Sequence, residues 1–113
     1  MGTYRMYADE QGVARWEEID LGKTPSWTEG IDVTQARFGS REAGVLQDWH
    51  PAPQRQFVVI LSGQLEIGLK DGSKHVFGPG DARLVEDVTG SGHTTGTFGD
   101  IPCVTATVPL ANQ

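Results

Sequence analysis

The segment 65–77, Leu-Glu-Ile-Gly-Leu-Lys-Asp-Gly-Ser-Lys-His-Val-Phe, carries the clearest structural signal in the chain. Apolar residues alternate with other residues over 65–69, which is the period of a strand with one buried face. Asp71-Gly72 separates this strand from the apolar and aromatic residues of 74–77. Because both positions of an Asp-Gly pair tolerate positive φ, the segment predicts an antiparallel hairpin.

On either side of this hairpin, the chain reads as short strands punctuated by turns. Its 15 glycines and 6 prolines are spread through the sequence, and no stretch longer than about 12 residues keeps the apolar period of a helix. Further strands are predicted at 4–7, 13–21, 31–38, 57–61, 82–86, 94–98 and 103–108. The segment 16–19 also permits a helical turn, and 22–30 reads as a surface loop. The regular spacing favours an all-β sandwich or barrel.

Composition limits the class of protein. A chain of 113 residues has room for one hydrophobic core. Its formal net charge of -6 would repel a phosphate backbone, so nucleic acid is not an expected partner. The single cysteine, Cys103, permits no internal disulfide, and no signal segment or membrane span is recognised, so we expect a cytoplasmic protein.

Residues 44–63 read GVLQDWHPAPQRQFVVILSG. They resemble the first motif of the cupin family, which is a glycine, five residues, His-x-His, three or four residues, a glutamate, six residues and a glycine. Gly44, His50 and Gly63 take their places in this motif. Ala52 stands at the second histidine position and Gln56 at the glutamate position, so two of the three metal ligands of the motif are altered.

Residues 77–93 read FGPGDARLVEDVTGSGH and resemble the second cupin motif through the turn at 79–81 and the histidine that follows. His93 comes two residues later than is common, Glu86 stands where proline is usual, and Thr97 replaces the usual asparagine. The resemblance implies an antiparallel double-sheet jelly-roll barrel. We expect a single cupin domain over 1–113, with a core barrel at about 31–109, N-terminal strands within 4–21, and a pocket inside the barrel.

Two kinds of chemistry fit the residues expected in that pocket. The resemblance implies that His50, Gln56 and His93 hold a divalent iron, manganese, nickel or zinc ion, to which Glu86 or Asp87 would add a carboxylate. The second interpretation needs no metal, and pairs His93 with Glu86 or Asp87 as a general acid/base dyad. The plainer alternatives are that the histidines only form hydrogen bonds and that the two acids lie in a solvated turn.

Neighbouring residues are assigned by strand alternation. Val58 and Ile60 share a face with Gln56 and are predicted to bind substrate. Trp49 is predicted either to cap the pocket mouth and bind substrate by stacking on a planar ligand, or to belong to the core. Arg55 and Arg83 are predicted to point away from the faces of Gln56 and Leu84, into solvent.

The sequence therefore predicts a small cupin-domain protein that binds a small organic molecule, with or without a divalent metal. It would act by metal-assisted or acid/base chemistry of the oxygenase, isomerase, cyclase or lyase type. The alternative is a non-catalytic ligand-binding or structural cupin with an altered site. A homodimer is expected, since the strand at 4–7 would leave an unpaired edge unless a partner chain covered it.

Overall fold

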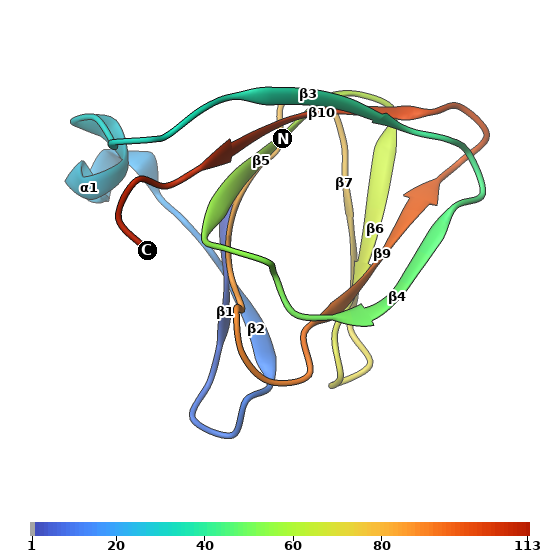
Figure 1. Cartoon of the computed structure of the whole chain (residues 1–113), viewed down its shortest axis with the longest axis horizontal. Helices are drawn as coiled ribbons and strands as arrows, with labels where there is room; N and C mark the ends of the chain where they lie inside the picture. Colours follow the sequence, from blue (N-terminus) through green and yellow to red (C-terminus); the bar gives the residue numbers. More distant parts are fainter. Residues whose placement is uncertain (1) are drawn as a thin grey trace.

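The computed structural model describes residues 2–113, which form two sheets that face each other (Figure 1). The larger sheet has the order β2 (Ala14–Glu18), β1 (Thr3–Ala8), β8 (Ala82–Glu86), β5 (Gln56–Ser62), β10 (Cys103–Pro109) and β3 (Arg37–Arg41). The smaller sheet has the order β4 (Leu46–His50), β9 (His93–Phe98), β6 (Gln64–Gly68) and β7 (Lys74–Phe77). Neighbouring strands are antiparallel except β1 and β8, which are parallel. The predicted all-β double-sheet jelly roll is confirmed.

The predicted hairpin over 65–77 is formed by β6 and β7, with Leu65 opposite Phe77 and Ile67 opposite His75. The turn between the two strands contains the predicted residues Asp71 and Gly72. Gly72 has a φ of 88°, and the Asp71 carboxylate accepts a hydrogen bond from the Ser73 backbone N–H at 2.8 Å.

Several strand boundaries differ from the prediction. β2 stops at Glu18 and is followed by a 3₁₀ turn, η1 (Leu21–Lys23), and one short helix, α1 (Pro25–Thr28), so the helical alternative for 16–19 is wrong. The strand predicted at 31–38 begins only at Arg37, since Val33 makes no more than an isolated bridge to Leu110. β4 was not predicted. No helix within residues 2–113 is long and apolar enough to cross a membrane.

The strand predicted at 4–7 is not an edge strand. β1 is hydrogen-bonded to β2 on one side and to β8 on the other, so the argument for a homodimer from its open edge is wrong. The edges of the larger sheet are β2 and β3, and one edge of the smaller sheet is β4.

Apolar side chains fill much of the space between the sheets, chiefly Met6, Ile60, Leu65, Ile67, Phe77 and Cys103. Tyr4, Trp16, His75 and Phe77 form a cluster of four rings that joins the β1–β2 hairpin to β7. Ring centroids in this cluster lie 4.2 to 6.2 Å apart. On the outer face of the larger sheet, Trp27 of α1 packs edge-on against Phe57.

The loop between β8 and β9 is pressed against two other parts of the chain. Gly92 has a φ of 70°, and a Cβ at this position would overlap the backbone oxygen of His50. Gly90 has a φ of 81°, and a Cβ there would overlap the Gly12 backbone oxygen. Only glycine fits these two positions. Gly92 holds the start of β9 beside the end of β4, and Gly90 holds the loop against the turn between β1 and β2.

We expect Gly92→Ala to lower the free energy of unfolding by about 3 kcal/mol, because it combines backbone strain with a backbone clash that cannot relax through a side chain. Gly72→Ala is the matched control. It has a similar φ, but nothing lies within 4 Å of a Cβ at that position, so only the strain of about 1 kcal/mol is expected. Urea denaturation of both variants measures the difference. Equal losses would show that the close approach to His50 is unimportant.

A candidate active site between the two sheets

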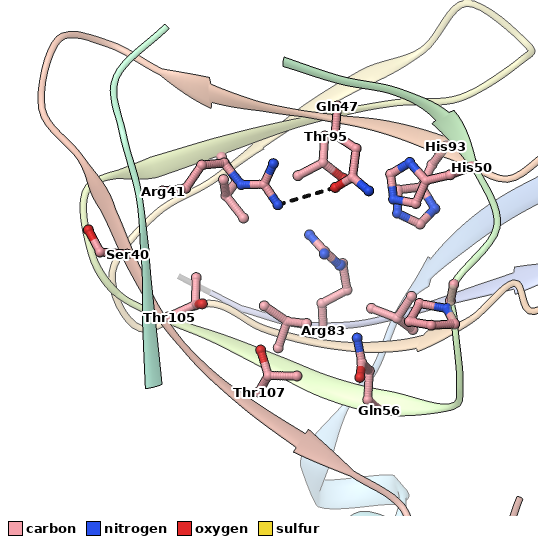
Figure 2. A pocket seen from close by; sticks show the side chains of 16 residues that line it. Ser40, Arg41, Gln47, His50, Gln56, Arg83, His93, Thr95, Thr105 and Thr107 are labelled. Atoms are coloured by element: carbon pink, nitrogen blue, oxygen red, sulfur yellow. Dashed lines mark hydrogen bonds between the residues drawn. The ribbon is translucent and has the colours of Figure 1, made fainter. Parts of the chain in front are cut away.

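A cavity of about 320 Å³ lies between the sheets (Figure 2). The exposed residues Gly39, Ser40 and Gln47, on edge strands β3 and β4, mark its mouth. The remaining lining residues are Arg41, His50, Ala52, Pro53, Gln56, Val58, Leu65, Arg83, Val85, His93, Thr95, Thr105 and Thr107. Most polar groups in this set come from inward-facing strand positions, so both sheets contribute to one chamber.

The two predicted histidines meet at one end of the cavity. His50 ends β4 and His93 begins β9, and they are direct partners in the sheet register. Their ring centroids are 4.6 Å apart, and Figure 2 shows the rings side by side. The Nδ1 of His50 lies 2.7 Å from the Asp48 backbone carbonyl, to which it donates when protonated.

His93 forms a buried pair with Asp87. Its Nδ1 lies 2.5 Å from a carboxylate oxygen of Asp87, and the exposed fractions of the two residues are 3% and 0%. Burial lowers the pKa of His93; the Asp87 hydrogen bond and charge oppose this shift, and the charges of Arg83 and His50 add to it. His93 is therefore a neutral imidazole at pH 7. With its Nδ1–H donated to Asp87, its Nε2 carries the free lone pair.

Of the two acids left open as partners of His93, the structure selects Asp87. Glu86 is the last residue of β8 and points to the outer face, where its two oxygens bind Arg5 at 2.6 Å and Arg55 at 2.7 Å. The prediction of Glu86 as the acid/base partner is therefore wrong. Asp87, one residue later, turns inward, as strand alternation requires.

The prediction that Arg83 is solvated is also wrong. Arg83 is only 5% exposed and its side chain lines the cavity. It lies opposite Val58 in the sheet register, whereas Leu84 lies opposite Phe57 on the outer face. Alternation along β8 was correctly expected, but the apolar Leu84 was taken for the inward residue. Arg55 does lie outside the cavity, half-buried against Glu86.

The other predicted pocket residues divide into two groups. Gln56 and Val58 line the cavity, and Gln56 Oε1 is buried without a hydrogen-bond partner within residues 2–113. Ile60 is buried in the core but does not line the cavity. Trp49 is 40% exposed, with the Lys70 ammonium 3.9 Å from its ring centroid. It therefore neither caps the mouth nor belongs to the core, and both interpretations of Trp49 were wrong.

The residues around this cavity do not fit a resident divalent metal. His50 and His93 supply two imidazoles from the smaller sheet, and Gln56 supplies a neutral amide from the larger one. Within residues 2–113, no group of three or more histidine, cysteine or acidic side chains has the arrangement of a metal site. The guanidinium groups of Arg83 and Arg41 line the same chamber, and their positive charge opposes a cation there. We derive no chemistry through a metal.

Comparisons with known proteins agree with the fold. No protein-family model matches the chain, and no curated protein matches its sequence. Among solved structures, a cupin-like protein from Thermotoga maritima MSB8 has a TM-score of 0.57 at 19% sequence identity, over 74% of this chain and 62% of that chain. The chain has the cupin fold.

Two further cupin-fold neighbours are named as enzymes. DMSP lyase DddQ from Ruegeria pomeroyi DSS-3 has a TM-score of 0.55 at 25% identity, over 68% of this chain and 38% of that chain. The dTDP-6-deoxy-D-glucose-3,5-epimerase RmlC from Legionella pneumophila Philadelphia 1 has a TM-score of 0.51 at 14% identity, over 96% of this chain and 64% of that chain. The chain thus spans less than two thirds of each of the three structures.

We expect two substitutions to move the pKa of His93 in opposite directions. Asp87→Asn removes the negative charge that raises this pKa, so it should fall further below 6.5. His50→Ala removes a charge that lowers it, so it should rise. Titration of the imidazole ¹⁵N and ¹³C signals by NMR measures both shifts. Shifts of the same sign in the two variants would contradict this arrangement of charges around His93.

Proposed function

We propose that this cupin binds a small organic molecule in the cavity and moves a proton on it by acid/base chemistry, without a metal. The observation that carries the proposal is the buried Asp87–His93 pair at the cavity wall. A base must be neutral at the working pH and within reach of its substrate. The lowered pKa of His93 meets the first condition and its place in the lining meets the second.

The proposed reaction begins at a carbon next to a carbonyl group of the bound molecule. The Nε2 of His93 takes a proton from this carbon, and the electron pair of the C–H bond becomes an enolate. The Asp87 carboxylate then faces an imidazolium and stabilises its charge, as an orienting acid does in other histidine dyads. Return of the proton gives an isomerised product, and loss of a leaving group from the next carbon gives an elimination product.

Three neighbouring groups suit the enolate that this step creates. His50 faces His93 across 4.6 Å between ring centroids, and in its protonated form it can return a proton to the intermediate. Arg83 and Arg41 bring positive charge to the chamber in which the enolate oxygen would develop.

Two cupin-fold neighbours are named as a lyase and an epimerase, which supports the proposal only as an analogy between proteins of one fold. We propose the cytoplasm as the compartment, because the one cysteine is a free, buried thiol.

Deuterium exchange tests this function even while the product is unidentified. The protein is incubated in D₂O with a panel of small 2-oxo and 3-oxo compounds, and deuterium at the carbon beside the carbonyl is measured by mass spectrometry. We expect His93→Gln to lower the exchange rate by roughly 10²–10⁴-fold, since that is the usual contribution of a general base. Asp87→Asn should lower it less, because the amide oxygen can still accept from Nδ1.

His75→Gln is the matched control, since His75 lies in the cluster of four rings and does not line the cavity. It should exchange deuterium at the rate of the unaltered protein. Saturation-transfer NMR on the same panel records binding separately. A compound that binds without any exchange would contradict proton transfer and favour the alternative function, which is a cupin that binds its ligand without acting on it.

A further inference from the structure

Arg83 differs from the arginines of the protein that form ion pairs. Arg5 and Arg55 both bind Glu86, and Arg15 binds Asp9, all at the surface or half-buried. Arg83 is almost fully buried, and within residues 2–113 its Nε and Nη1 have no hydrogen-bond partner. Removing a guanidinium from water without giving it a hydrogen-bond partner is energetically unfavourable. A buried charge without a partner is expected where a bound ligand supplies the partner.

The charge on Arg83 persists despite its burial. Burial lowers the pKa of Arg83 to about 10, and the Asp87 carboxylate opposes this shift, so the group is still a cation at neutral pH. Its side chain is held over the Phe77 ring, with Cζ 5.1 Å from the ring centroid. Figure 2 shows the guanidinium rising from β8 to the middle of the cavity, between Arg41 on one side and the histidine pair on the other.

A second guanidinium adds to this positive charge. Arg41 lines the same chamber and forms a hydrogen bond of 3.4 Å with the uncharged amide of Gln47. Its charge is close enough to lower the pKa of Arg83. Within the described residues, the carboxylate that acts on Arg83 is that of Asp87, whose Oδ2 is bound to His93. Arg41, Arg83 and Asp87 together contribute a charge of about +1 to the chamber, inside a chain of net charge -6.

We propose that this cavity is a carboxylate-binding site, in which Arg83, assisted by Arg41, holds the acid group of a small organic monoanion. The inference deepens the proposed function and rests on it for what His93 does to the bound molecule. A guanidinium matches the two oxygens of a carboxylate in shape and charge. The single negative charge of a carboxylate neutralises the positive charge in the chamber, whereas a phosphate dianion carries more negative charge than the chamber can balance. The hydroxyl groups of Ser40, Thr105 and Thr107 are donors for the same oxygens.

The size of the chamber limits the acid. A cavity of about 320 Å³ is at the lower end of ligand pockets, so the anion has only a few carbon atoms. Arg83 lies between Arg41 and the histidine pair in Figure 2. A carboxylate bound there places the next carbons of a 2-oxo or 3-oxo acid toward His93, which is where the proposed proton transfer takes place.

The test compares charged ligands with uncharged ligands of the same shape. The probes are monocarboxylates from acetate to 2-oxopentanoate, each beside its primary amide, with inorganic phosphate as a further anion. Binding is followed by calorimetry and by the NMR signal of the Arg83 Nε–H group. We expect the acids to bind and shift this signal, and the amides to bind at least 10-fold more weakly, as is usual for loss of a hydrogen-bonded charge.

Arg83→Gln should reduce carboxylate affinity by roughly 10–100-fold, the factor expected for a charge-assisted hydrogen bond, and Arg41→Gln by less because Arg41 is partly exposed. Arg55→Gln is the matched control, since it removes an arginine that lies outside the cavity and should leave affinity unchanged. Arg83→Gln should also raise the Tm of the free protein, because it removes an unpaired buried charge. A misfolded variant would lower the Tm, so the two effects are distinguishable.

Three results would overturn the carboxylate site. These are equal binding of acids and amides, unchanged affinity in Arg83→Gln, and the absence of binding by every acid at saturating concentration. Preference for phosphate over all the acids would replace the carboxylate with a phosphate group. Carboxylate binding without deuterium exchange would leave the site in place and remove only the proposed proton transfer, so the two proposals fail separately.

Discussion

The hydrogen bond between Asp87 and His93 connects the two sheets at the site. Asp87 directly follows β8 of the larger sheet and His93 begins β9 of the smaller one. The backbone of Asp87 also accepts a hydrogen bond of 3.0 Å from Ala52, which lies in the connection from β4 to β5. Both chain crossings near the cavity are thus tied to one buried residue, Asp87, one through its backbone carbonyl and the other through its carboxylate. The same hydrogen bond sets the tautomer of His93. One interaction therefore both links the two sheets and leaves Nε2 of His93 free to accept a proton.

The charge of the protein is divided between its surface and its interior. The chain carries a net charge of -6, yet the two guanidinium groups that face the cavity meet one carboxylate. The acidic surface gives a small anion no general attraction to the molecule, so selectivity has to arise inside the chamber. Most of the binding energy would then be local, from contacts that exist only after the ligand has left solvent.

The sequence predicted local features better than those that depend on the packing of the two sheets. Asp71-Gly72 specifies its turn from adjacent residues, and the motif around His50 located the pocket. Strand alternation predicted that Arg83 and Leu84 face opposite ways, but not which faced inward, because the Leu84 side is buried as well. β4 was not predicted because Trp49 and its neighbours lie on an edge strand and are largely exposed, so their sequence lacks the alternation of buried and exposed residues. The choice of Asp87 over Glu86 depended on Arg5 and Arg55, which no local pattern connects to Glu86.

The parallel pairing of β1 with β8 has a consequence for biosynthesis. The backbone N–H of Gly2 binds Asp81, 79 residues away, so the β1–β2 hairpin emerges from the ribosome long before its neighbour in the sheet. At ~5–20 residues per second, the interval between the end of β2 and the start of β8 is roughly 3 to 13 seconds. A β1–β2 hairpin that forms during that time has one unpaired edge along β1, which is open to other nascent chains. The positive charge of Arg5 on this strand, which binds Glu86 in the finished fold, opposes pairing of the free edge with strands of other chains.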